Sequence, residues 1–165
     1  MLRDEGVQVW GASRNPETVA KTEGWRPVVL DLLEVGSIHA AVEQVRAEAG
    51  VPDILVNNAG AGVFAGFGHF PPDEISRQLQ LLLEGPVMLT RAFWPEMLAR
   101  KSGALVNVAS LAAEFPLPGL SLYTAAKAGL TGFTQTLMIE AADSGLQVLR
   151  SQARRVGKEC RSRRA

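Results

Sequence analysis

Short apolar runs of strand length alternate with longer stretches of helical period along most of the chain. In one of these stretches Ile38, Ala41, Val42 and Val45 recur at the i, i+3, i+4 and i+7 positions that share one face of a helix. The pattern predicts strands at 7–12, 28–30, 53–56, 104–108 and 146–149. It predicts helices at 16–24, 37–49 and 121–142, and a helical region at 73–100 that breaks at Gly85 and Pro86. Strands and helices that alternate in this way are typical of an α/β domain with a parallel sheet.

The composition indicates one globular domain, because 47% of the 165 residues are hydrophobic and 21% are charged. The single cysteine, Cys160, cannot form an internal disulfide, and no Cys and His pair has ligand spacing. A disulfide scaffold and a structural zinc site are therefore excluded. No apolar run approaches the roughly 18 residues of a membrane span, and charged residues follow Met1 almost at once. The sequence predicts a cytoplasmic protein with no membrane partner.

The net charge of zero conceals two regions of opposite charge. Residues 1–149 hold 10 basic and 16 acidic side chains, a net charge of −6, whereas residues 150–165 hold seven basic and one acidic, a net charge of +6. This change predicts a partial domain over 1–149 and a solvated, poorly ordered tail over 150–165. A nucleic-acid-binding patch is the alternative for the tail, but the acidic body provides no supporting basic surface, so no nucleic-acid partner is expected.

Tyr123 and Lys127 stand four residues apart in the last predicted helix, and Ser110 follows the strand at 104–108. Because positions i and i+4 share a helix face, the Lys127 ammonium is expected near the Tyr123 ring, where a cation stabilises the phenolate. Such a phenol can exchange a proton with an alcohol or carbonyl oxygen. The Ser110 hydroxyl, at the carboxyl end of a parallel strand, can hydrogen-bond the same substrate oxygen. Taken alone, the pair is far more typical of an ordinary helix surface than of a catalytic site.

A polar run follows the strand predicted at 53–56. It consists of Asn57, Asn58, Ala59 and Gly60. Three motifs follow one another along the chain: this run, then Ser110, and then Tyr-Thr-Ala-Ala-Lys ending at Lys127. Their residues and their order resemble the short-chain dehydrogenase/reductase family. The resemblance extends from about Leu2 to Val148 and implies a Rossmann-like, doubly wound α/β fold. It also implies hydride transfer between a nicotinamide cofactor and a carbonyl or secondary alcohol.

The resemblance implies a role for each catalytic candidate. Tyr123 corresponds to the family's acid/base, and Lys127 to the residue that favours the ionised tyrosine and holds the nicotinamide ribose. Ser110 corresponds to the hydroxyl that positions the substrate. The run from Asn57 to Gly60 corresponds to the segment that supports the central sheet and passes beside the adenosine ribose.

Two further residues bear on the choice of cofactor. Arg14 resembles the arginine that meets the 2′-phosphate of NADP, so the resemblance favours NADP over NAD. Asp31 resembles the acid whose carboxylate contacts the adenine amine, and a simple strand cap is its alternative role.

Three departures from the family accompany these matches. The family begins with a strand and a Gly-rich turn that binds the cofactor pyrophosphate, whereas Met1 falls near the end of the helix that follows. The central strand of the order 3-2-1-4-5-6 and the phosphate site are therefore expected to be missing, which puts cofactor binding in question. Leu82 stands where the family usually has an asparagine that holds a water of the proton relay. After Leu149 the basic tail replaces the family's Pro-Gly loop and substrate-binding region.

The loop over 61–70 is rich in glycine and phenylalanine. Its glycine residues match a phosphate-loop spacing only weakly, because two prolines separate them from the next helix, and the segment is interpreted as an active-site loop. Phe64, Phe67 and Phe70 either line an apolar substrate pocket or pack within the loop.

Two functions are compatible with this sequence. The first is NADP-dependent hydride transfer to or from a small-molecule carbonyl or alcohol, whose identity the sequence does not specify. The second is a catalytically silent fragment or pseudoenzyme that binds a partner subunit. The helices predicted at 73–100 and 121–142 correspond to the usual contact between subunits in the family, so a homo-oligomer is expected.

Overall fold

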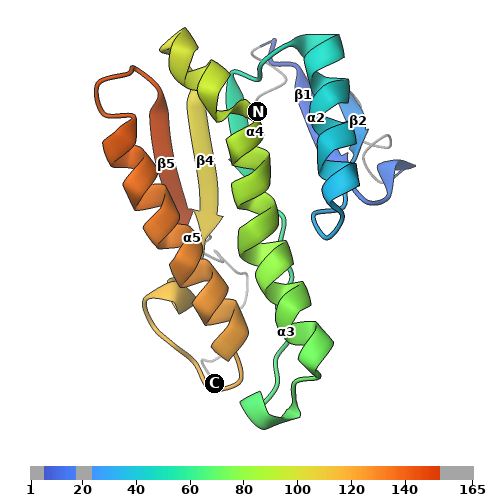
Figure 1. The fold of residues 1–165 in the computed structure, drawn as a ribbon, viewed down its shortest axis with the longest axis vertical. Helices are drawn as coiled ribbons and strands as arrows, with labels where there is room; N and C mark the ends of the chain where they lie inside the picture. The colour runs from blue at the N-terminus through green and yellow to red at the C-terminus, as the bar shows by residue number, and fades with distance from the viewer. Residues whose placement is uncertain (1–5, 18–23, 153–165) are drawn as a thin grey trace, which may run out of the picture.

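The computed structural model describes residues 6–17 and 24–152. Strands and helices alternate along these residues, which confirms the predicted α/β pattern (Figure 1). The strands are β1 (Val9–Ser13), β2 (Trp25–Val29), β3 (Ile54–Asn57), β4 (Ala104–Ala109) and β5 (Gln147–Gln152). The α-helices are α2 (Val35–Ala49), α3 (Pro72–Leu79), α4 (Gly85–Arg100) and α5 (Ser121–Glu140).

A π-helical segment, η3 (Gln80–Glu84), joins α3 directly to α4. The helical region predicted over 73–100 is therefore continuous and does not break at Gly85 and Pro86. Pro86 has no backbone N–H to donate, so the helical ladder must be interrupted near it, and one wide turn provides this without ending the helix. This segment contains Leu82, which stands where the resembling family usually has an asparagine.

The beginnings of two helices differ in how far they match the prediction. Helix α2 begins at Val35, two residues before the predicted start at 37, and Ser37 Oγ accepts a hydrogen bond from the Asp31 backbone N–H at 2.9 Å. Near the N-terminus, Asn15 Oδ1 accepts a hydrogen bond from the Glu17 backbone N–H at 3.0 Å, as a helix cap does. Residues 18–23 of that predicted helix lie outside the described residues.

Strand β5 extends further than predicted. It pairs with β4 through Arg150, opposite Asn107, and ends at Gln152. The change to basic composition does not end the strand, because ladder pairing uses backbone groups and the Arg150 side chain lies 2.9 Å from Glu114 Oε1. The domain boundary after Leu149 stays a prediction, and the tail over 153–165 lies outside the described residues.

The described strands form two parallel sheets, β1–β2 and β3–β4–β5. In the doubly wound order 3-2-1-4-5-6, these sheets correspond to positions 3-2 and 4-5-6. No strand within the described ranges fills the central position between β1 and β3. The fold is therefore an incomplete Rossmann-like arrangement, as expected, and β1 and β3 each have one edge with no described strand partner.

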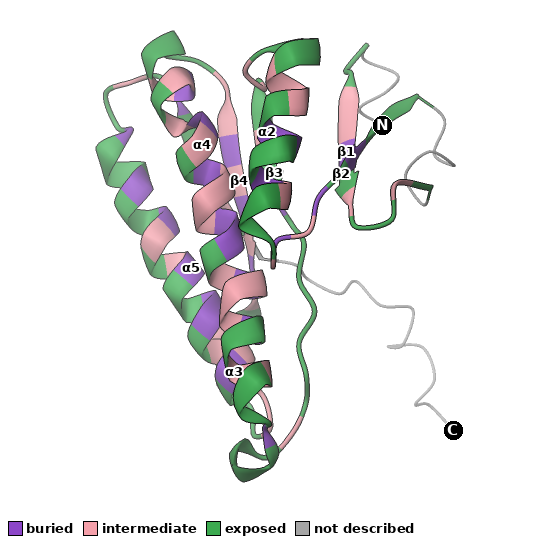
Figure 2. Cartoon of the chain, turned by 45° about the vertical axis from the view of Figure 1, so that its right-hand side comes forward, coloured by how far each residue is buried: buried purple, intermediate pink, exposed green. Residues whose placement is uncertain are grey.

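Helices α2, α4 and α5 lie on the same side of the strands (Figures 1 and 2). Alternate strand residues face them, and in β4 Leu105 and Asn107 are fully buried. On the opposite side, Ile54 and Val56 of β3 are 53% and 52% exposed. The described helices thus cover one face of the described strands.

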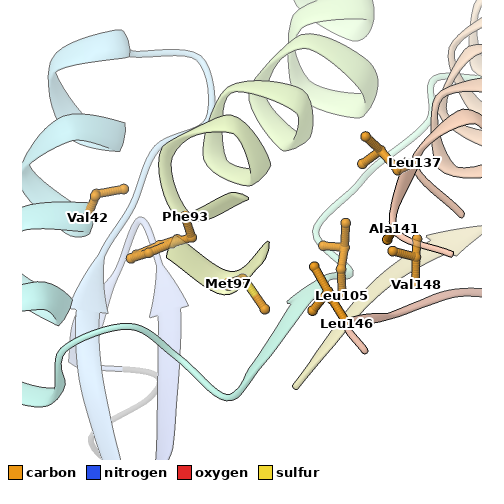
Figure 3. Packing of buried hydrophobic residues seen from close by; sticks show 8 residues of the cluster. All are labelled: Val42, Phe93, Met97, Leu105, Leu137, Ala141, Leu146 and Val148. Carbon is orange, nitrogen blue, oxygen red and sulfur yellow. The ribbon is translucent and has the colours of Figure 1, made fainter. Parts of the chain in front are cut away.

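Two apolar clusters lie between the helices and the strands. The larger lies beneath α4 and α5 (Figure 3) and contains Val42, Phe93, Met97, Leu105, Leu137, Ala141, Leu146 and Val148. The smaller joins β2 to α2 and contains Val28, Leu30, Leu32, Ile38 and Ala41. Half-buried Val45 of α2 and Leu89 of α4 pack against both clusters, so the contact between these helices connects the two sheets. Arg46 strengthens it with hydrogen bonds to Ala92 O at 2.7 Å and Glu96 Oε1 at 3.0 Å.

A buried polar network fixes the carboxyl ends of β3 and β4. Asn57 Nδ2 donates to Asn107 Oδ1 and to Thr90 Oγ1, each at 2.8 Å. Asn107 Nδ2 donates to Thr134 Oγ1 at 2.9 Å, and the Thr134 hydroxyl donates to Leu130 O at 2.6 Å. Side chains from β3, β4, α4 and α5 are therefore joined in one chain of hydrogen bonds. Loss of Thr134 would leave Asn107 Nδ2 without this acceptor inside the fold.

Thr134→Ala tests the contribution of this network, with Thr136→Ala as a matched control. Both hydroxyls donate a hydrogen bond to the carbonyl four residues earlier on α5. Thr134 also accepts a hydrogen bond from the buried Asn107 amide, whereas Thr136 is exposed. We expect Thr134→Ala to lower the free energy of unfolding by about 1 to 3 kcal/mol, because an Asn107 N–H loses its acceptor. Thr136→Ala should change it by less than about 0.5 kcal/mol. Urea unfolding followed by circular dichroism measures both values, and equal losses would contradict the assignment.

Candidate active site

The carboxyl ends of the strands carry most of the predicted site residues. Arg14 follows β1, Asp31 follows β2 by two residues, Asn57 ends β3, and Ser110 follows β4. Open parallel sheets bind their ligands at this edge, because loops and helix N-termini meet there. The topology thus brings residues far apart in the sequence to one edge of the fold.

Lys127 reaches from α5 to the end of β4. Its Nζ donates a hydrogen bond to Val108 O at 2.8 Å, and the residue is only 4% exposed. Burial lowers the pKa of the Lys127 ammonium below its ordinary value of 10.5, because the charged form loses hydration. The bond uses one of three N–H donors and leaves two for other acceptors.

Leu82 and Lys127 both lie against Gly60. A Cβ atom added to Gly60 would stand 2.8 Å from Leu82 Cδ2 and 3.7 Å from Lys127 Nζ. Leu82 is fully buried, and its side chain offers no hydrogen bond. Position 82 therefore lies beside the lysine, but with an apolar side chain that adds to the low-dielectric surroundings of the ammonium.

The Tyr123 ring packs against the backbone of the loop that follows Gly60. A Cβ atom added to Gly62 would stand 2.7 Å from Tyr123 Cδ2. The absence of a side chain at Gly62 is thus what allows the ring to approach this loop. The interpretation of this segment as an active-site loop stays a prediction.

Ser110 caps a short 3-10 turn, η4 (Leu111–Ala113). Its Oγ accepts a hydrogen bond from the Ala112 backbone N–H at 3.2 Å, and the residue is half-buried. A hydroxyl that accepts a hydrogen bond still has its own proton to donate. Ser110 stands two residues after Val108, whose carbonyl holds Lys127, so β4 positions both groups.

Asp31 serves a local turn. Its Oδ1 accepts a hydrogen bond from the Leu33 backbone N–H at 3.0 Å, and its own backbone N–H donates to Ser37 Oγ. The alternative role as a strand cap is therefore observed, and a contact with adenine stays a prediction. Arg14 is exposed beyond the end of β1, and its predicted role also remains a prediction.

Sequence reasoning missed three residues that support the site. Asn107, Thr90 and Thr134 hold the end of β3 through the buried network described above. The only available signal was an asparagine within the apolar run at 104–108. The three phenylalanines of the loop, which share one predicted role, differ in the structure. Phe70 is buried, whereas Phe64 and Phe67 are exposed.

The donor set at this edge fits the nicotinamide and ribose end of a dinucleotide. Lys127 has spare N–H donors for ribose hydroxyls, and Asn58, Ala59 and Gly60 are exposed beside it. For a pyrophosphate, the described residues contain no glycine-rich turn that opens a helix. Nor does the described part contain a cluster of three or more His, Cys, Asp or Glu side chains suited to a metal ion. No helix in the described ranges is long and apolar enough to cross a membrane.

Comparison with known proteins identifies similar chains and folds. The sequence model of the short chain dehydrogenase family matches residues 1–153. A 3-ketodihydrosphingosine reductase of Bacteroides thetaiotaomicron is 32% identical over 141 residues, which are 85% of this chain and 51% of that protein. This chain therefore spans about half the length of that relative.

Solved structures give the same result for the fold. A short-chain dehydrogenase from Streptomyces avermitilis has a TM-score of 0.84 and 33% identity over 90% of this chain and 56% of that chain. A gluconate 5-dehydrogenase from Burkholderia cenocepacia, in complex with NADP and tartrate, has a TM-score of 0.82 and 26% identity. This match covers 92% of this chain and 62% of that chain.

The buried lysine makes stability depend on pH in a predictable direction. The unfolded chain keeps the Lys127 proton up to about pH 10.5, whereas the folded chain releases it at lower pH. Between the two values the unfolded state binds more protons, so stability rises with pH. We expect the free energy of unfolding of the natural chain to rise relative to Lys127→Met as pH increases toward 10.5. Urea unfolding of both proteins from neutral pH upward measures the difference, and parallel curves would refute it.

Gly62→Ala tests the packing of the tyrosine, with Gly68→Ala in the same loop as control. A Cβ atom at Gly62 meets the Tyr123 ring, whereas one at Gly68 meets nothing within 4 Å. We expect Gly62→Ala to shift the ring resonances of the single tyrosine in an NMR spectrum while circular dichroism stays unchanged. Gly68→Ala should leave those resonances in place. A shift of similar size in both variants would show that the ring does not lie on Gly62.

Proposed function

The chain belongs to the short-chain dehydrogenase family, and on that premise we propose that its site transfers a hydride between NADP(H) and a carbonyl or secondary alcohol. One observation carries the proposal: the hydrogen bond from Lys127 to Val108 O places the lysine at the strand end where Ser110 follows. Tyr123 lies one helical turn before that lysine, against Gly62. The acid/base, the cation and the positioning hydroxyl are thus held by two adjoining elements, β4 and α5.

Each residue has a distinct role in this proposal. Tyr123 gives its phenolic proton to the carbonyl oxygen during reduction, and takes it back during oxidation. Lys127 stabilises the phenolate that forms and offers its remaining N–H donors to a ribose. Ser110 donates a hydrogen bond to the substrate oxygen. The nicotinamide cofactor, when bound, supplies or accepts the hydride.

NADP is the proposed cofactor. Arg14 stands after β1, at the strand end where a cation would meet a 2′-phosphate, and Asp31 follows β2. The gluconate 5-dehydrogenase similar to this chain was solved with NADP, which supports a cofactor of this class. The name of the Bacteroides relative specifies reduction of a ketone, which supports a carbonyl as the oxidised substrate.

A catalytically silent chain that binds a partner subunit is the second candidate. The buried Leu82 favours it, because a leucine beside Lys127 cannot hold a water of a proton relay. Helices α4 and α5 would form the contact in a homo-oligomer or with a longer relative.

Tyr123→Phe distinguishes the two candidates. If the chain is an enzyme, loss of the phenolic proton should lower the rate of NADPH oxidation with a ketone by about 100-fold or more. Absorbance at 340 nm measures the rate, and nicotinamide fluorescence measures cofactor binding in the same samples. A folded chain that binds NADPH but shows no turnover, or one that turns over equally well as Tyr123→Phe, contradicts the proposed activity.

A matched pair of serine variants controls this experiment. Ser110 Oγ accepts from the N–H two residues later, and Ser144 Oγ does the same with Leu146. Ser110→Ala and Ser144→Ala therefore lose the same kind of local hydrogen bond. Only Ser110→Ala should lower turnover, since Ser144 lies outside the site.

A further inference from the structure

Two loops carry apolar side chains into solvent at the edge where the site lies. The first loop spans residues 61–71, between β3 and α3, and the second spans 111–120, between β4 and α5. Six large side chains on them are between 39% and 74% exposed: Val63, Phe64, Phe67, Leu111, Phe115 and Leu117. In Figure 2 the first loop is exposed over most of its length. Exposed apolar side chains that are concentrated in this way are typical of a surface that binds a ligand or a partner.

Both loops begin or end at a residue of the site. The first starts directly after Gly60, and its Gly62 lies against the Tyr123 ring. The second starts directly after Ser110 and ends three residues before Tyr123. The apolar side chains are therefore carried by the same segments that position the reacting groups.

Direct contacts hold the two loops together. The Ala65 backbone N–H donates to Gly119 O at 3.0 Å. The Phe64 ring packs over the same glycine, where an added Cβ atom would stand 2.8 to 3.0 Å from three ring carbons. Within the second loop, the Phe115 N–H donates to Leu111 O at 2.8 Å. The loops thus form one wall beside Tyr123.

This wall offers no unpaired charge to a substrate. The first loop contains a single titratable side chain, His69, and the second contains Glu114. Glu114 Oε1 lies 2.9 Å from Arg150 Nη1 on β5, so its charge is already balanced. A phosphate, carboxylate or ammonium on the substrate would find no opposite charge on these loops, whereas an alkyl or aromatic group would leave water for an apolar surface.

From this arrangement we infer the class of substrate, an inference that rests on the proposed function. The substrate is an uncharged ketone or secondary alcohol with an alkyl or aromatic substituent of several carbons. Its oxygen lies at Ser110 and Tyr123, and its apolar substituent lies along the wall formed by the two loops. Phe64 and Phe115 then determine specificity by the apolar area that they bury.

Direct binding of a series of ketones tests the inference without requiring turnover. The probes are 2-butanone, 2-hexanone, 2-octanone and 2-decanone, and their binding to the full chain is measured by isothermal titration calorimetry. We expect the Kd to fall by up to about fourfold for each methylene that the wall covers. Phe64→Ser and Phe115→Ser should each flatten this dependence. Ile54→Ser, a similarly exposed apolar residue at the amino end of β3, should leave it unchanged.

Several outcomes would overturn the inference. A Kd that does not depend on chain length, or a dependence that Phe64→Ser and Phe115→Ser leave intact, excludes the loops as the substrate wall. Equal binding of 2-octanone and the charged 2-oxooctanoate excludes a preference for uncharged ligands. If sedimentation shows that Phe64→Ser dissociates an oligomer while the ketone series is unaffected, the wall is a contact between copies of the chain.

Reduction of the same ketones by NADPH separates this inference from the proposed function. Binding that depends on chain length without any reduction supports the apolar wall and contradicts the activity. Reduction at rates that are indifferent to chain length supports the activity and contradicts the apolar wall. Rates that rise with chain length, and that fall in Phe64→Ser but not in Ile54→Ser, support both.

Discussion

The hydrogen bond between the side chains of Asn57 and Asn107 is the interaction on which the site depends. It joins the carboxyl ends of β3 and β4 inside the fold, where neither amide can exchange its partner for water. Thr90 and Thr134 extend it to α4 and α5. Since the exposed run after Asn57 and the serine after β4 both continue from these strand ends, their relative position follows from this network.

The same half of the molecule contains Ser110, Tyr123 and Lys127, the three residues proposed for catalysis. Lys127 reaches from α5 to Val108 O, and the Tyr123 ring, also on α5, packs against the loop that follows β3. The packing that holds the Lys127 side chain at Val108 O also removes its ammonium from water. The same burial therefore fixes the position of Lys127 and lowers its pKa. Leu82 increases this effect where a polar residue would relieve it.

Arg14 and Asp31 lie in the other half, on β1 and β2. This half is connected to the first by the packing of α2 on α4, through Val45 and Leu89, and not by strand pairing among the described residues. The residues proposed for the adenosine end of the cofactor, Arg14 and Asp31, are therefore connected to those proposed for the nicotinamide end through helix packing. No described strand pairs with both β1 and β3.

The sequence alone determined the order of the described strands and helices, because this order depends on local hydrophobic period. Short motifs also predicted Ser110, Tyr123 and Lys127 as a catalytic group, and that role stays a prediction. Strand β5 exceeded its predicted end at Leu149, since a ladder depends on the neighbouring backbone and not on side-chain charge. Only the tertiary structure decided that Asn107 is a buried partner of Asn57, that Gly62 makes room for the Tyr123 ring, and that Phe70 is buried while Phe64 is exposed. Each of these outcomes depends on residues distant in the sequence, whose proximity exists only after the strands and helices have packed.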